Sequence, residues 1–273
     1  MQDGHSGGVF AGLAPARRRL IIGALAALAV LAVAVPVTVA VANRPPPAAD
    51  QNRLGPVLLV PGYGGSTDSL RSLAARLVAA GRDATIVSLP GDGTGDLVAA
   101  ADALGDQALA ALDRTGAPSV DVVGYSAGGV TARLWAADGG AALARRIITL
   151  GSPNHGTTVA DLANSVLPDP CPAACRELAT DSDLLRRLNA GGETPDGPTW
   201  VSIWTTQDET VTPPDSSHLD GALNLTAQSV CPDARVGHGD LPTAPLVQQM
   251  VLTELGAGQP VPLDATDCTA LSS

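Results

Sequence analysis

One serine stands among glycines at 124–128, where the sequence reads GYSAG and matches the pattern G-x-S-x-G. The apolar run SVDVV precedes this segment, and a segment with helical spacing follows it. A serine on a tight strand-to-helix turn presents its hydroxyl as a nucleophile, and the helix N-terminus behind it stabilises a developing anion. Flanking glycines are needed because such a turn leaves no room for Cβ atoms. We therefore predict that Ser126 is a nucleophile and not part of a plain glycine-rich turn.

A serine nucleophile needs a base, and the chain has four histidines. A site with the order nucleophile, acid, base favours His238, which lies late in the chain in RVGHGDLP. His5 precedes a long apolar segment and cannot join the site, and His218 lies in the loop segment PPDSSHLDG. We interpret His155, in GSPNHGT, as a structural residue or part of the pocket rim.

The base in turn needs an acid that orients it, and Asp208 fits this role. It ends the segment WVSIWTTQD, so it follows a predicted strand at the edge where open α/β sheets place their sites. The competing carboxylates lie in loops without a preceding strand; they are Asp215, Asp220, Asp233 and Asp240.

An acyl-transfer site also needs two backbone N–H groups that bind the oxyanion. Ala127, directly after the serine, is expected to supply one, and Tyr63 in the loop PGYGG is expected to supply the other through its backbone. Gly62, Gly64 and Gly65 let that loop approach closely. PGYGGS could instead cradle a phosphate, but no G-K-[ST] follows it.

The elements that must position these residues alternate between strand and helix from Leu54 onward. This alternation predicts right-handed βαβ units and a mostly parallel sheet with helices on both faces, in one domain over 54–273. The segment 157–198 is the least regular and is a possible cap, either a mobile lid or a fixed wall, with a helix expected at 176–189. Strands are predicted at 56–60, 84–89, 119–124, within 144–153 and at 199–205, and helices at 69–81, 96–116 and 127–140.

The N-terminal region has the composition of an export segment. Residues 1–19 end in ARRR and are interpreted as a cytoplasmic or signal n-region, and residues 20–42 are apolar and uncharged. The apolar run is either an uncleaved membrane anchor or a signal peptide cut after 40–42, and RRRLI loosely resembles a twin-arginine signal. A proline-rich linker is predicted at 43–53. In both cases the catalytic domain is expected outside the cytoplasm, extracellular or membrane-anchored.

The cysteine count agrees with export, because an even number outside the cytoplasm indicates disulfides. Four cysteines allow three pairings, of which we favour Cys171–Cys175 and Cys231–Cys268. A zinc site is the rival interpretation of CPAAC, but no second close pair of Cys or His joins it, so no metal is expected.

The charge balance limits the partners. A net charge of -11 argues against a nucleic-acid partner, which would need a basic face.

The segment PGDGTGD resembles a calcium loop through Asp92 and Asp96, but it lacks the full ligand set that ends in Glu, so we expect a loop at the rim of the site. We expect a monomer that needs no cofactor.

Taken together, these segments resemble a known family, the α/β-hydrolase lipases and esterases, and in particular the small bacterial class 2 lipases. The matching pieces, in order, are VLLVPGYGGS, TGAPSVDVVGYSAGG, LGSPNHGT, SIWTTQDETVTP and VGHGDLP. The resemblance implies the α/β-hydrolase fold, a triad of Ser126, Asp208 and His238, and oxyanion donors at Tyr63 and Ala127. Two departures concern pocket shape: Pro61 stands where the first loop usually has His, and Tyr125 replaces the usual His before the serine.

The predicted activity is hydrolysis of carboxylic esters of lipids, or of small esters, through an acyl-enzyme. One alternative keeps the triad but changes the acceptor, which gives an acyltransferase or thioesterase that acts on envelope lipids. The other alternative is a non-catalytic binding protein of the same fold, since fold alone does not determine function.

Overall fold

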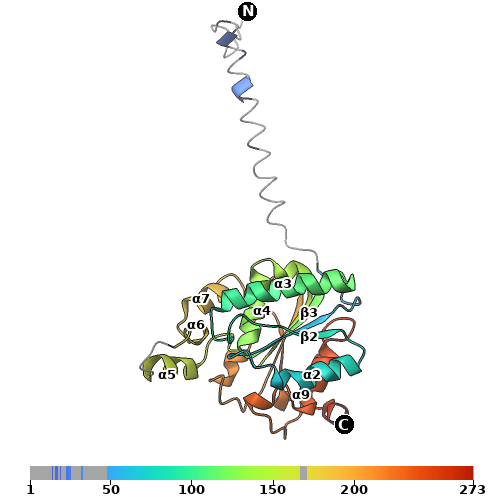
Figure 1. Ribbon diagram of the computed structural model, residues 1–273. Coiled ribbons are helices and arrows are strands. Elements are labelled where there is room, and N and C mark those ends of the chain that lie inside the picture. The colour runs from blue at the N-terminus through green and yellow to red at the C-terminus, as the bar shows by residue number, and fades with distance from the viewer. Residues whose placement is uncertain are drawn as a thin grey trace, which may run out of the picture. The chain divides into compact units, whose positions relative to one another are not determined.

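The computed structural model describes residues 48–166 and 171–272, together with residues 14, 16, 17, 19, 23–25 and 32. The chain divides into two compact units, Met1–Pro45 and Pro46–Ser273, and the second unit carries the sheet (Figure 1). The predicted apolar segment at 20–42 falls almost wholly outside the described residues, as does the first part of the linker. Among the residues that are described, no helix is both long enough and apolar enough to cross a membrane.

The second unit is built on a sheet of six parallel strands in the order β2-β1-β3-β4-β5-β6. The central strands β1, β3 and β4 are buried except at Tyr125, the last residue of β3, as their mostly apolar sequences require. Because all six strands run in the same direction, their carboxyl ends meet at one edge of the sheet. The strands are β1 (Val57–Val60), β2 (Ala84–Ile86), β3 (Val120–Tyr125), β4 (Ala144–Leu150), β5 (Thr199–Trp204) and β6 (Leu223–Thr226).

Helices cover both faces of this sheet (Figure 1). Short 3-10 turns lie at η1 (Gly140–Leu143), η2 (Pro214–Ser217) and η3 (His238–Asp240). The described helices are α2 (Asp68–Ala79), α3 (Leu97–Thr115), α4 (Ala127–Ala137), α5 (Thr158–Val166), α6 (Ala173–Glu177), α7 (Asp183–Asn189), α8 (Ala227–Val230), α9 (Pro245–Glu254) and α10 (Cys268–Leu271).

The alternation of side chains along β1 separates two cores. Val57 and Leu59 point to the face that α2 and α9 cover, and Leu58 and Val60 point to the face that α3 and α4 cover. The helix α2 buries Leu70, Leu73 and Leu77, which lie on one side of the helix. The fold class predicted from the sequence is therefore confirmed: a parallel sheet with helices on both faces.

Two elements differ from the sequence-based expectation. The edge strand β6 was not predicted, because LNLT is short and only Leu225 in it is buried. The single helix expected at 176–189 is divided into the end of α6 and the separate helix α7. Two contacts account for the break: the Asp161 carboxylate, from a separate helix, accepts hydrogen bonds from the backbone N–H and hydroxyl of Thr180, and the Ser182 side chain caps α7.

A buried cluster of charged residues lies near the amino ends of the central strands, opposite the edge where the carboxyl ends meet. Asp121 on β3 accepts hydrogen bonds from Arg145 Nε at 2.8 Å and from Arg145 Nη2 at 2.7 Å. Arg82 adds a third bond to the same carboxylate at 2.5 Å. Both Asp121 and Arg145 are fully buried, where an unpaired charge would be costly, and each compensates the charge of the other.

Glu254, at the end of α9, lies beside this cluster without a strong partner of its own. Its carboxylate accepts one hydrogen bond, from the Val261 N–H at 3.1 Å. The other oxygen, Oε1, is buried and has no partner among the described residues. Burial raises the pKa of Glu254 to about 7, and the Val261 bond and the charge of Arg146 offset this only in part.

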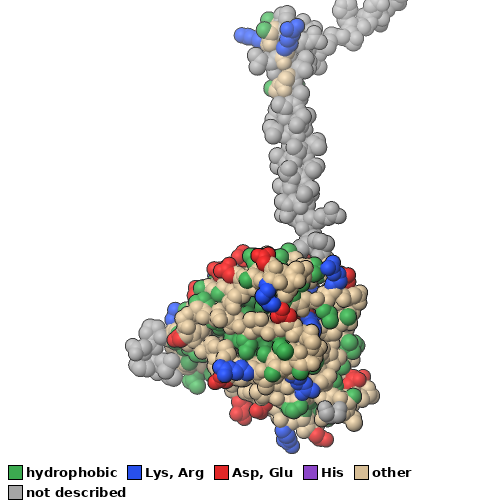
Figure 2. All heavy atoms as spheres, turned by 45° about the vertical axis from the view of Figure 1, so that its right-hand side comes forward, with side chains coloured by type: hydrophobic (Ala, Val, Ile, Leu, Met, Phe, Trp, Pro, Cys, Tyr) green, Lys and Arg blue, Asp and Glu red, His purple; other side chains and the backbone are tan. Residues whose placement is uncertain are grey.

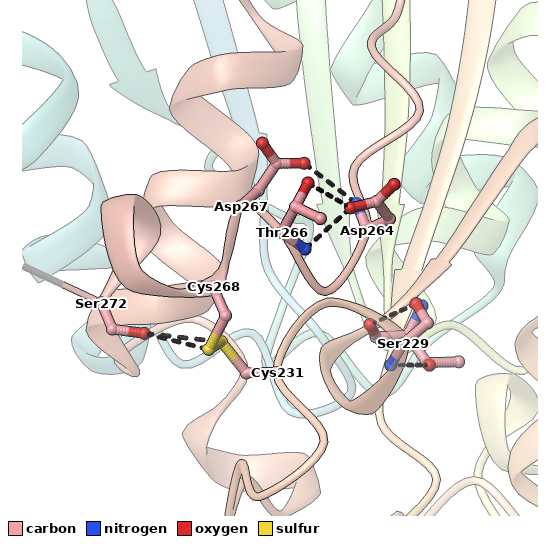
Figure 3. Close-up of a disulfide and its surroundings, with 8 residues drawn as sticks. Ser229, Cys231, Asp264, Thr266, Asp267, Cys268 and Ser272 are labelled. Carbon is pink, nitrogen blue, oxygen red and sulfur yellow. Dashed lines mark hydrogen bonds between the residues drawn. A yellow bond between two sulfur atoms is a disulfide. The ribbon is translucent and has the colours of Figure 1, made fainter.

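The structure contains both favoured disulfides, Cys171–Cys175 and Cys231–Cys268. Figure 3 shows the second bridge, which joins the residue after α8 to the first residue of α10, with the Ser272 hydroxyl beside the sulfur atoms. In the turn before α10, the Asp264 carboxylate accepts from the Thr266 N–H. The bridge therefore attaches the C-terminal segment to the chain that leads toward His238.

Candidate active site

Ser126 lies between the last residue of β3 and the first residue of α4. Its φ is 53°, and within the described part of the chain it is the only residue other than glycine with a positive φ. Such a backbone costs on the order of 1–3 kcal/mol and persists only where the surroundings hold it. Two backbone bonds do so here: Ser126 N–H donates to Leu150 O at 2.9 Å, and Ser126 O accepts from Gly129 N–H at 3.0 Å.

The glycines on either side of the serine are required by close backbone contacts. A Cβ at Gly124 would overlap the backbone of the first turn of α4. A Cβ at Gly128 would overlap the carbonyl oxygens of Val60 and Pro61. The G-x-S-x-G spacing therefore lets the start of α4 pack against both β3 and the loop after β1.

The structure brings together the three residues that the sequence singled out. His238 Nε2 lies 3.0 Å from Ser126 Oγ, and His238 Nδ1 lies 2.8 Å from Asp208 Oδ2. The Asp208 side chain is fully buried, and that of His238 is 10% exposed. A carboxylate only accepts hydrogen bonds, so the proton of a neutral imidazole resides on Nδ1 and Nε2 is free to accept from the serine hydroxyl.

The local turn after β5 fixes the orientation of Asp208. Its second oxygen, Oδ1, accepts from the N–H of Thr210 at 2.9 Å and from the N–H of Val211 at 2.7 Å. These bonds leave Oδ2 facing His238. The two backbone bonds therefore hold the carboxylate in the orientation that contacts the imidazole.

The other candidate histidines lie elsewhere. His155 Nε2 lies 2.6 Å from Glu193 Oε1, and its Nδ1 lies 3.2 Å from Ser216 O, so it joins loops beside the site. His218 lies 3.6 Å from the exposed carboxylate of Asp220. Neither histidine contacts the Ser126 hydroxyl, which agrees with the interpretation of His155 as structural or pocket-rim.

The two expected oxyanion donors lie on adjoining segments. Gly62 is packed so closely against Ser126 that a Cβ at position 62 would lie 3.0 Å from the Ser126 Cβ. The next residue is Tyr63. Within the described part of the chain, the N–H groups of Tyr63 and Ala127 donate to no other protein group. The loop is held by Gly64 N–H, which donates to Gly93 O at 3.1 Å.

A small, partly open cavity of about 40 Å³ lies beside Ala127, and Gly62, Leu97 and Thr131 are among the other residues that line it. The short helix α6 is hydrogen-bonded to the chain that lines this cavity. Ala174 N–H donates to Thr94 O at 3.2 Å, and Leu97 N–H donates to Glu177 Oε2 at 2.9 Å. Part of the segment proposed as a cap is thus attached to the loop before α3.

Tyr125 contacts His238, which the sequence did not reveal. Its hydroxyl donates to the backbone oxygen of His238 at 3.2 Å, across 113 residues of sequence. The two rings lie 5.3 Å apart between centroids and are tilted by 31°. Burial, followed by the charges of Asp208 and Asp240, raises the pKa of Tyr125 to about 12.

A second unpredicted group of residues joins the loop that carries Asp208 to the loop that carries His238. Thr205 Oγ1 donates to Val236 O at 2.7 Å, and Gln228 Nε2 donates to Thr205 Oγ1 at 3.0 Å. The Gln228 oxygen accepts from the Thr206 N–H at 3.0 Å. No sequence motif marks these residues, because their bonds connect segments that meet only in the folded chain.

Comparisons with known proteins agree with this architecture. Residues 55–169 match the family model described as the alpha/beta hydrolase fold. Aspergillus fumigatus lipase B has a TM-score of 0.61 at 18% identity, over 84% of this chain and 63% of that chain. The mature form of Bacillus licheniformis lipase BlEst2 has a TM-score of 0.59 at 18% identity, over 78% of this chain and 95% of that chain. No curated protein sequence matches the chain.

The fold and the family-model match together define the class: this chain has the α/β-hydrolase fold, as the sequence predicted. Its solved structural neighbours include lipases. This chain spans less than two thirds of the Aspergillus fumigatus protein to which it is similar.

Proposed function

We propose that the protein is an exported serine hydrolase that cleaves carboxylic esters of lipids or small esters. The observation that supports this most strongly is the continuous chain of hydrogen-bonding groups from Ser126 Oγ through His238 to Asp208, with distances of 3.0 and 2.8 Å. Both distances lie within the range that proton transfer requires.

In the proposed reaction, the Ser126 hydroxyl attacks the ester carbonyl carbon while His238 Nε2 takes its proton. Asp208 holds the imidazole in the required tautomer and stabilises its charged form. The carbonyl oxygen becomes an oxyanion, which the free N–H groups of Tyr63 and Ala127 bind. His238 then protonates the departing alcohol, and water repeats the sequence to release the acid from Ser126.

The compartment is part of the same proposal. Both disulfides of the described region are typical of proteins outside the cytoplasm. The apolar N-terminal segment of the sequence supports export, as either a signal peptide or an anchor.

The decisive test is turnover of p-nitrophenyl esters of increasing acyl length by the full chain with its disulfides intact, with Ser126→Ala as control. Hydrolysis by the wild type alone is expected. Labelling by a fluorophosphonate should occur at Ser126. A folded protein that is neither labelled nor active would contradict the proposal and favour a binding protein. If new esters form when an alcohol acceptor is added, and hydrolysis is slow, the acyltransferase alternative is correct.

A further inference from the structure

We propose that Tyr125 is a positioning residue, whose hydroxyl and ring hold His238 at the distance from which the imidazole reaches Ser126. This inference rests on the proposed role of His238 as the base. Tyr125 is the last residue of β3 and is bonded directly to Ser126 in the chain. The strand that presents the nucleophile would therefore also hold the base.

Two separate contacts join Tyr125 to His238. The phenol donates to the backbone oxygen of His238 at 3.2 Å, which fixes the main chain of the base. The ring lies 5.3 Å from the imidazole between centroids, which limits rotation of the side chain. The tyrosine ring also packs near the oxyanion loop, because a Cβ at Gly62 would lie 3.5 Å from Tyr125 Cδ1. One side chain thus contacts both the base and the oxyanion loop.

His238 needs such support because it lies in a three-residue turn, η3, that follows an irregular segment. The bonds inside this turn are local: Asp240 N–H donates to Gly237 O at 3.2 Å, and Leu241 N–H donates to His238 O at 3.2 Å. They define the shape of the turn but not its distance from β3. The Tyr125 hydroxyl supplies a direct bond from the turn to the strand of the nucleophile.

The direction of this bond is fixed by chemistry. The His238 carbonyl accepts only, so the phenol donates. Burial and the carboxylates of Asp208 and Asp240 keep the phenol protonated well above neutral pH. The bond is therefore present throughout the pH range in which a neutral imidazole acts as a base.

The alternative is that Tyr125 contributes packing alone. The variant Tyr125→Phe distinguishes positioning from packing, because it keeps the ring and removes only the hydroxyl donor. Positioning predicts that kcat falls about fivefold, the equivalent of about 1 kcal/mol, with KM unchanged. Tyr125→Leu removes the ring as well, and a loss of about 100-fold is expected, as for other small misplacements of catalytic groups. Space filling predicts that Tyr125→Phe has wild-type kinetics.

Trp200→Phe is a matched control. Trp200 is buried and its Nε1 donates to a backbone oxygen, that of Pro195, at 3.1 Å. It lies at the opposite end of β5 from the acid loop. Trp200→Phe should lower the melting temperature as Tyr125→Phe does, and leave kcat unchanged. Equal kinetic effects of the two substitutions would overturn the proposal.

A measurement without substrate completes the test. In Tyr125→Phe the His238 ring is held less firmly beside Asp208, so the NMR signal of the His238 Nδ1–H proton should broaden or move from its wild-type position, whereas Trp200→Phe should leave it unchanged. An unchanged signal in Tyr125→Phe overturns the positioning role, even if esters are hydrolysed. A changed signal in a protein that hydrolyses no ester supports positioning and contradicts only the proposed function.

Discussion

Asp208 Oδ2 and His238 Nδ1 lie 2.8 Å apart although 30 residues separate them in the sequence. Asp208 follows β5, and His238 follows β6 and α8. Parallel pairing of Trp204 with Thr226 brings the carboxyl ends of these two strands to the same edge of the sheet. The Thr205 and Gln228 side chains then hold the two loops together. The contact between Asp208 and His238 therefore depends on the register of β5 and β6 as well as on the two side chains.

Asp208→Asn should lower kcat about 10³–10⁴-fold with little effect on folding. An asparagine that turns its amide toward His238 donates to Nδ1, which places the imidazole proton on Nε2 and stops it from accepting the serine proton. The rate of fluorophosphonate labelling should fall in parallel with turnover of p-nitrophenyl acetate. Asp220→Asn is the matched control, since that exposed carboxylate lies 3.6 Å from the other loop histidine, His218. Comparable losses in both variants would refute the assignment of the acid.

Gly128→Ala should destabilise the protein by about 1–3 kcal/mol, because the new methyl group meets the carbonyl oxygens of Val60 and Pro61. Urea unfolding measures this, and Gly191→Ala is the control, since a Cβ there meets nothing within 4 Å. We expect activity to fall further than stability predicts, because the start of α4 carries the Ala127 N–H. Unchanged stability would mean that the two segments do not pack as closely as described.

Replacing Cys231 and Cys268 together by serine should lower stability by about 2–4 kcal/mol, since that bridge spans 37 residues. Replacing Cys171 and Cys175 should cost less, because their separation is 4 residues. Cys231 precedes the irregular segment that leads to His238, so activity should decline before the far-ultraviolet helix signal does. Parallel loss of both signals on reduction would show that the bridge holds the whole fold and not the base loop.

Glu254→Gln should change how stability depends on pH. The folded-state pKa of Glu254 is raised from 4.5 to about 7, so the folded protein binds this proton more tightly than the unfolded chain does. The stabilising contribution of the proton is complete below pH 4.5 and is lost as pH rises through 7, on the order of 3 kcal/mol in all.

The variant should therefore gain stability relative to wild type as pH rises from 4.5 to 8, measured as the difference in urea midpoints. A constant difference between Glu254→Gln and wild type across this range would show that Glu254 does not titrate as described.

The sequence by itself determined the local features of this protein. The G-x-S-x-G spacing specified the turn at Ser126, because only glycine fits beside the backbone of Val60 and Pro61. Alternating apolar runs and helical periods specified the parallel sheet, and the order of motifs singled out Asp208 and His238. These signals are readable because each depends on residues that are close in the chain.

The tertiary structure decided what depends on contacts between distant segments. It determined that Tyr125 reaches the carbonyl of His238 and that Thr205 and Gln228 join the loops that carry Asp208 and His238. It also divided the expected helix at 176–189, through the bonds of Asp161 to Thr180, and added the edge strand β6. No local period encodes such contacts, because hydrogen bonds between loops form only after the sheet has set the distance between them.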